Sequence, residues 1–107
     1  MADAGWKRAA IDISTATTTA VITGVTGEYF AVKKMFLHSS GTNAVTIKSG
    51  TTVLCGKLDM VAQWRVLWDD EDDVSWLRAI ASADSLNFVT TQAVQLSGWV
   101  VYQSSPN

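Results

Sequence analysis

Short runs of β-branched and aromatic residues, interrupted by turn-forming residues every few positions, recur along this chain of 107 residues. Val, Ile, Thr and aromatic residues suit a pleated, half-buried surface, and many short strands at close spacing are typical of a β-sandwich or barrel. The pattern predicts an all-β, antiparallel fold. The nine predicted strands cover residues 9–14, 18–23, 29–38, 44–48, 52–55, 63–68, 74–80, 86–90 and 94–103.

Alternating apolar positions predict which side of each strand faces the core, because successive side chains point to opposite faces. Gly98 stands inside a predicted strand, where glycine marks a bulge or a close approach of two backbones. Residues 74–83 fit a short amphipathic helix as well, but we expect a strand or an irregular corner there. The residues expected to face the core are Ile11, Ile13, Val45, Ile47, Trp64, Val66, Trp68, Val94, Leu96, Val100 and Tyr102.

The length allows one domain, and 48% hydrophobic against 17% charged residues favours a folded body. We expect the sandwich to span residues 9–103, with an N-terminal arm over residues 1–8 and a C-terminal tail over residues 104–107. With a single cysteine, Cys55, an intrachain disulfide is excluded, so stability has to come from packing.

The charge and the hydropathy of the sequence indicate which classes of partner are not expected. The net charge is −2 and the eight basic residues are scattered, so a nucleic-acid partner is not expected. No apolar run is long enough to span a bilayer, and residues 1–8 lack the apolar region of a signal peptide. We therefore expect no membrane partner and synthesis in a reducing cytoplasm.

The candidates for catalysis are few. His38 is the only histidine and is expected at a strand end facing solvent, beside Ser39 and Ser40. Cys55, near Lys57, is expected to be buried and to pack as a small hydrophobic residue. No paired carboxylates stand out on opposed strands. The sequence therefore predicts neither an enzyme nor a cofactor.

An acidic run holds half of the ten acidic residues. Such density is costly unless the loop is solvated or holds a cation. The run lacks the glycine and the distal glutamate of an EF-hand loop, so we favour a solvated loop, with a calcium or magnesium site as the alternative. Its residues are Asp69, Asp70, Glu71, Asp72 and Asp73.

Five tryptophans are many for this length, and aromatic residues are enriched in protein interfaces. Trp64 and Trp68 are expected to fill the core. Trp99 and Val101 have the opposite parity to the inward residues of their strand, so we expect them on a contact surface for a subunit or partner. Trp6 belongs to the predicted arm, which is expected to reach a neighbouring subunit.

Three segments resemble small β-sandwich proteins that are common in tailed-phage genomes. The most distinctive is the C-terminal segment SLNFVTTQAVQLSGWVVY at residues 85–102. The others are IDIS at residues 11–14, followed by residues 17–21, and VTIKSG at residues 45–50. The acidic run and the high tryptophan content depart from the usual pattern of that group.

The resemblance implies a jelly-roll fold and a binding role in the virion, similar to that of capsid decoration (cement) proteins. It further implies the major capsid protein and other copies of the chain as partners, with a homotrimer favoured over a dimer, and a place on the capsid surface. A tail- or fibre-associated module is an alternative. A carbohydrate-binding module is another, because β-sandwiches display aromatic platforms for sugars.

Overall fold

The computed structural model describes residues 6–69 and 77–105, which contain strands and no helix. β-Branched and aromatic residues are frequent in these strands, as expected for a pleated surface. The eight strands are β1 (Trp6–Ile13), β2 (Thr18–Ile22), β3 (Tyr29–Ser39), β4 (Asn43–Ser49), β5 (Thr52–Met60), β6 (Trp64–Asp69), β7 (Leu86–Thr90) and β8 (Leu96–Ser105).

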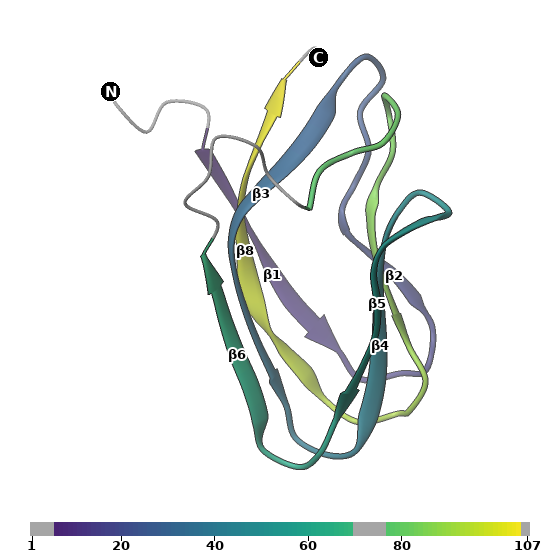
Figure 1. Ribbon diagram of the computed structural model, residues 1–107, viewed down its shortest axis with the longest axis vertical. Coiled ribbons are helices and arrows are strands. Elements are labelled where there is room, and N and C mark those ends of the chain that lie inside the picture. Colours follow the sequence, from purple (N-terminus) through teal and green to yellow (C-terminus); the bar gives the residue numbers. More distant parts are fainter. Residues whose placement is uncertain (1–5, 70–76, 106–107) are drawn as a thin grey trace.

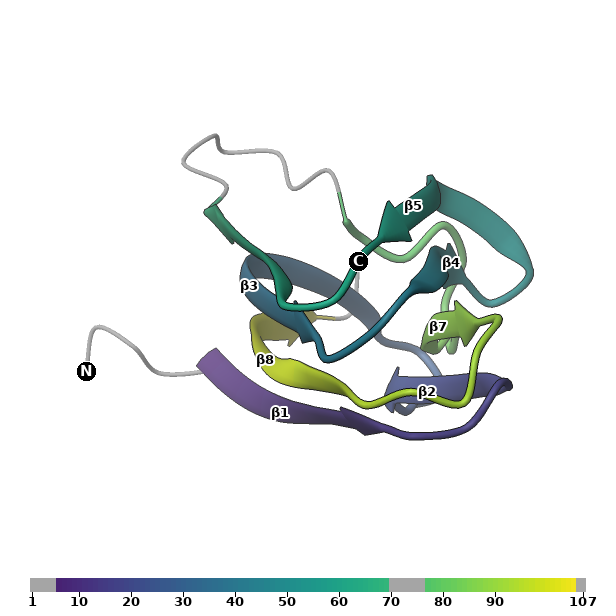
Figure 2. The same ribbon diagram turned by 90° about the horizontal axis from the view of Figure 1, so that it is seen from below.

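The strands form two antiparallel sheets of four, which lie face to face (Figures 1 and 2). Sheet A has the order β1-β8-β3-β6, and sheet B has the order β2-β7-β4-β5. The pairing is nested along the chain: β1 pairs with β8, β2 with β7, β3 with β6, and β4 with β5. This is the connectivity of a jelly roll. The predicted all-β, jelly-roll-like sandwich is therefore confirmed.

The core lies between the sheets and is built by alternation along each strand. In β4 every second residue is buried, from Asn43 through Val45 and Ile47 to Ser49. In β3 a bulge between Val32 and Lys34 shifts the alternation by one residue. Six of the eleven residues predicted to face inward are buried: Ile11, Ile13, Val45, Ile47, Leu96 and Val100. The other five are half-buried: Trp64, Val66, Trp68, Val94 and Tyr102.

Gly98 marks a close approach of β8 to β3. Its φ of 153° is one that residues with a side chain rarely adopt. A Cβ added there would overlap the carbonyl oxygen of Phe36 and lie 2.8 Å from its carbonyl carbon and 3.2 Å from Leu37 Cα. The close backbone approach expected at this glycine is confirmed.

Residues 74–80 were expected to form a strand or an irregular corner, and their described part, residues 77–80, is irregular and not a strand. Arg78 makes an isolated bridge with Ala31, flanked by backbone hydrogen bonds from Val32 N to Leu77 O (2.8 Å) and from Ala79 N to Phe30 O (2.9 Å). The segment is therefore extended and buries Leu77 and Ala79, but the pairing is too short for a strand. A helix is absent from residues 77–83 as well.

Several strands extend past their predicted ends. β1 begins at Trp6, which pairs with Gln103, so residues 6–8 of the predicted arm belong to sheet A. β5 continues from Cys55 to Met60 through the register shifts of its pairing with β4. Strand β8 begins at Leu96 and ends at Ser105, so residues 104–105 of the predicted tail belong to sheet A as well.

Asn43 stabilises the turn that connects β7 to β8 through hydrogen bonds. Its side chain is 3% exposed, and Oδ1 accepts hydrogen bonds from the backbone N–H groups of Ala44 (2.8 Å), Thr91 (3.2 Å) and Gln92 (3.1 Å). The Nδ2 group is buried and has no hydrogen-bond partner. Oxygen, and not nitrogen, is therefore the atom through which this amide stabilises the turn.

We expect Asn43→Ala to lower the free energy of unfolding by about 2 kcal/mol, because three backbone donors lose their acceptor. Asn43→Asp is the matched control: it keeps the acceptor and removes the unpartnered donor, so its loss should be smaller. Urea denaturation of both variants and the wild type measures the difference. An Asn43→Ala protein as stable as the wild type would contradict this role.

Candidate functional site

The outer face of sheet A carries an apolar row that crosses all four strands. Ala10 of β1 pairs with Trp99 of β8, Trp99 pairs with Phe36 of β3, and Phe36 pairs with Leu67 of β6. Directly opposed residues of an antiparallel sheet point to the same face. We call Ala10, Trp99, Phe36 and Leu67 the central row.

Core residues on the inner face of sheet A support the central row, whose own side chains point away from the core. The core side of the same strands is taken by Ile11, Leu37 and Val100, which leaves the neighbouring central-row residues pointing outward. The Trp99 and Phe36 rings stack with centroids 6.1 Å apart and planes inclined by 28°. Trp99 is 38% exposed and Leu67 is 65% exposed. A large apolar surface at this position favours contact with another molecule.

Charged residues border the central row on both sides. One bordering row consists of Arg8, Val101, Lys34 and Asp69, and the other consists of Asp12, Ser97, His38 and Arg65. Lys34 Nζ lies 3.8 Å from Asp69 Oδ2, and Gln95 Nε2 donates to Asp12 Oδ1 at 2.7 Å. An apolar centre with a polar rim is the usual anatomy of a protein interface.

A shallow hollow of about 540 Å³ lies beside Trp99 on this face. Its lining includes the indole of Trp99, Val101, and the basic residues Arg8 and Lys34. A partner side chain that enters it would meet an aromatic ring flanked by two positive charges. The hollow therefore extends the central row toward the β1 side of the sheet.

The outer face of sheet B lacks such a feature in its best-defined rows. One row pairs Ala20 with Asn87, Asn87 with Lys48, and Lys48 with Val53. These residues are small, polar or aliphatic, and none is aromatic. The two outer faces are therefore chemically distinct, and the stacked aromatic pair found among the described residues lies on that of sheet A.

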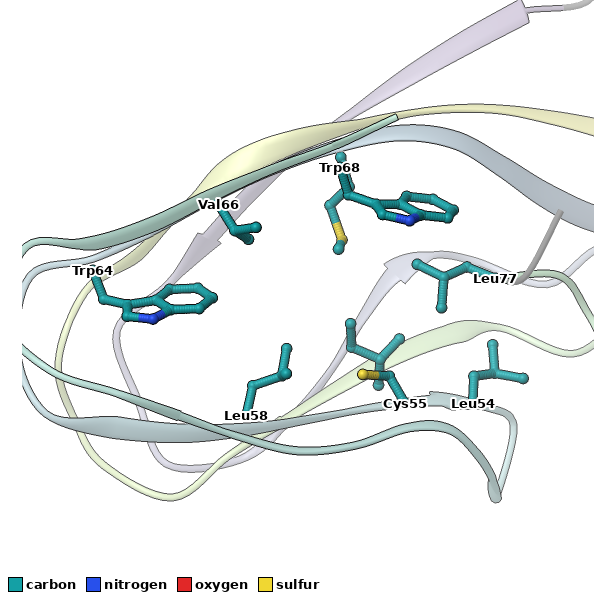
Figure 3. Close-up of a pocket in the computed structure, with 9 residues that line it drawn as sticks. Leu54, Cys55, Leu58, Trp64, Val66, Trp68 and Leu77 are labelled. Carbon is teal, nitrogen blue, oxygen red and sulfur yellow. The ribbon is translucent and has the colours of Figure 1, made fainter. Parts of the chain in front are cut away.

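A second feature is an apolar cavity of about 340 Å³ between the sheets, at the edge where β5 and β6 lie (Figure 3). Trp64, Val66 and Trp68 enter it from sheet A, which confirms that these tryptophans face inward. Leu54, Cys55 and Leu58 line the opposite wall. Cys55 is a free cysteine and only half-buried, in contrast to the buried residue expected from the sequence.

The structure places the predicted site residues as follows. Trp99 and Val101 lie in adjacent rows of the same outer face, which agrees with their predicted parity. Trp6 lies in β1, and its side chain is outside the described residues. Asp69 ends β6 and pairs with Lys34, whereas Asp70, Glu71, Asp72 and Asp73 lie outside the described residues.

His38 is half-buried on the outer face of sheet A, one residue before the end of β3. Its Nε2 lies 3.0 Å from Gln63 Oε1, an amide oxygen that does not act as a general base. Within residues 6–69 and 77–105, no three His, Cys, Asp or Glu side chains gather as a metal site. The arrangement at His38 is a polar contact beside the central row.

Sequence reasoning missed most of the central row. Phe36 lies between the buried Met35 and Leu37, and Leu67 lies between Val66 and Trp68, so both are apolar residues of outward parity. The outward direction of Phe36 and Leu67 could be predicted from the sequence of each strand. Their alignment with Trp99 could not be predicted, because it depends on the register between strands that are distant in the chain.

Comparisons with protein-family models, with curated proteins and with solved structures found no match for this chain. In the part of the chain that the structure describes, no helix is long and apolar enough to cross a membrane.

Proposed function

We propose that this chain is a structural protein of a tailed-phage particle, and most specifically a capsid decoration protein that binds the major capsid protein. The sandwich associates with copies of itself and clamps neighbouring coat subunits at the capsid surface. Burial of apolar surface against a repeating lattice strengthens the shell without any chemical step. A tail- or fibre-associated module is the alternative, which would use the same sandwich at a different place in the particle.

The observation that carries the proposal is the exposed central row on sheet A, through which copies of the chain associate with one another. Trp99 and Leu67 are large apolar side chains held on a rigid sheet, and water surrounds them unless a partner covers them. The proposal of a tailed-phage particle rests on the resemblance of residues 11–21, 45–50 and 85–102 to phage β-sandwich proteins. Fold alone does not assign a function, so the surface and the resemblance support the proposal together.

A binding role fits the side chains better than catalysis does. The polar groups around the central row form ion pairs and amide contacts, such as Lys34 with Asp69 and His38 with Gln63. Nucleophilic catalysis needs a nucleophile, a base and an orienting group in one pocket. The apolar cavity between the sheets offers Cys55 among aliphatic and indole side chains. We therefore propose no reaction for this protein.

Carbohydrate binding is less well supported than protein binding. Sugar platforms use aromatic side chains that present a free face. Of the three tryptophans whose side chains the structure describes, Trp64 and Trp68 point into the cavity between the sheets (Figure 3). The third, Trp99, stacks against Phe36 and is 38% exposed, so among the described tryptophans a single indole offers a surface to a ligand.

Co-sedimentation with empty, expanded capsids tests the proposed function. We expect the purified chain to pellet with capsids assembled from the major capsid protein of the same phage, and to saturate at a fixed ratio to coat subunits. Quantitative gel densitometry counts the copies, and the chain without capsids is the control for self-pelleting. Absence of saturable binding, with binding to a glycan array instead, would overturn the proposal in favour of a carbohydrate-binding module.

A further inference from the structure

The four corners of the outer face of sheet A alternate in charge. Arg8 and Asp69 end one bordering row, and Asp12 and Arg65 end the other. Each corner thus has the opposite sign to the next corner along the row and across the central row. All four residues are exposed, and the apolar central row runs between them.

This pattern is complementary to itself. When two copies of a flat face are brought together about a two-fold axis in the plane of contact, each corner meets a neighbouring corner of the other copy. An axis parallel to the strands brings Arg8 opposite Asp69 of the second copy, and Asp12 opposite Arg65 of the second copy. Each of these two ion pairs occurs twice in the pair of chains, so all four corners are matched by an opposite charge.

The sizes of the central-row side chains favour the same axis. It places the small Ala10 opposite the large Leu67, and Trp99 opposite Phe36. The facing side chains then fill a similar distance between the two sheets along the whole row. An axis parallel to the central row would instead pair Ala10 with Ala10 and Trp99 with Trp99, which leaves a gap at one end and crowds the middle. Alternation of large and small residues across facing positions is what close packing requires.

The area available is adequate for a specific contact. The face consists of four strands of six to eleven residues. With about 4.8 Å between strands and 3.3 Å per residue, it covers roughly 550 Å² before side-chain relief is added. A standard interface buries about 800 Å² of accessible surface on each partner, so the face is close to that size once its relief is counted.

We propose that a second copy of this chain docks on the outer face of sheet A, about a two-fold axis that runs parallel to the strands. Two sheets that pack face to face lie about 10 Å apart with strand directions within about 30° of each other, a geometry that this axis allows. The contact supplies the self-association step of the proposed function, and it forms without any capsid component. It differs from the three-fold assembly that the phage resemblance implies.

Charge exchange between Asp12 and Arg65 tests this contact. Arg65→Asp and Asp12→Arg each place like charges opposite one another, and we expect each to weaken self-association by roughly 30-fold or more. The double variant Asp12→Arg/Arg65→Asp restores the pairing and should return to within about fivefold of the wild-type Kd. Lys48→Asp, on the outer face of sheet B, makes the same change in net charge as Arg65→Asp and should leave the Kd unchanged.

Equilibrium sedimentation from micromolar to millimolar concentration, without capsids, gives each Kd and the number of subunits. A two-subunit species with rescue in the double variant supports the contact. A monomer throughout, a three-subunit species, or a double variant weaker than either single variant would overturn it. Capsid binding is measured separately, so a chain that binds capsids but does not pair refutes this inference alone. A chain that pairs but does not bind capsids refutes the proposed function alone.

Discussion

Gly98→Ala should remove a large part of the stability of the fold. The added Cβ would overlap the carbonyl oxygen of Phe36, and both sides of the clash are backbone of paired strands in the middle of sheet A. Relief requires β3 and β8 to separate, which breaks hydrogen bonds on both sides of the clash. The φ of 153° adds strain for any residue with a side chain.

We expect a loss of more than about 4 kcal/mol in the free energy of unfolding, a large part of the stability of about 5–15 kcal/mol for a domain. Circular dichroism during thermal unfolding measures it. Gly56→Ala in β5 is the matched control, because an added Cβ there meets nothing within 4 Å, and its stability should stay within about 0.5 kcal/mol of the wild type. A Gly98→Ala protein that melts within a few degrees of the Gly56→Ala control would contradict the close approach.

Alternation of apolar residues was the most reliable guide to the fold. It predicted the inward faces of β1, β4 and β6, and it placed Trp99 on the outer face through the parity of Leu96 and Val100. These predictions rest on side-chain geometry within one strand, which the sequence records directly. The predicted class of fold followed from the number and spacing of such segments.

The pairing between strands could not be predicted from sequence patterns. The first residues of β1, including Lys7 and Arg8, are charged and lack a strand signature, and they are held by hydrogen bonds to β8 at the other end of the chain. Residues 77–80 have the composition of a strand, but their partner at the start of β3 offers a single bridge. Tertiary context decided both cases.

The candidate site was partly predictable for the same reason. Trp99 and Val101 were identified from the parity of β8 alone. The other members of the central row, Ala10, Phe36 and Leu67, come from three different strands. These residues form one surface only because of the register between the strands of sheet A. No local sequence pattern encodes that register.

Trp99→Ala should weaken self-association far more than it weakens the fold. In the proposed pair of chains Trp99 lies near the two-fold axis opposite Phe36 of the second copy, and both symmetry-related contacts are lost at once. Truncation of a central interface tryptophan costs about 2–4 kcal/mol, which weakens the Kd by at least about 30-fold. Within one chain the indole is 38% exposed and stacks on Phe36, so folding should lose only about 1 kcal/mol.

Val53→Ala is the matched control, since Val53 is an exposed apolar residue, 53% accessible, on the outer face of sheet B. The most direct measurement is equilibrium sedimentation of wild type, Trp99→Ala and Val53→Ala, paired with urea denaturation at concentrations where each chain is dissociated. The account predicts that Trp99→Ala alone loses the two-subunit species while all three chains unfold within about 1 kcal/mol of one another. Equal association constants for Trp99→Ala and the wild type would show that the central row is not a contact surface.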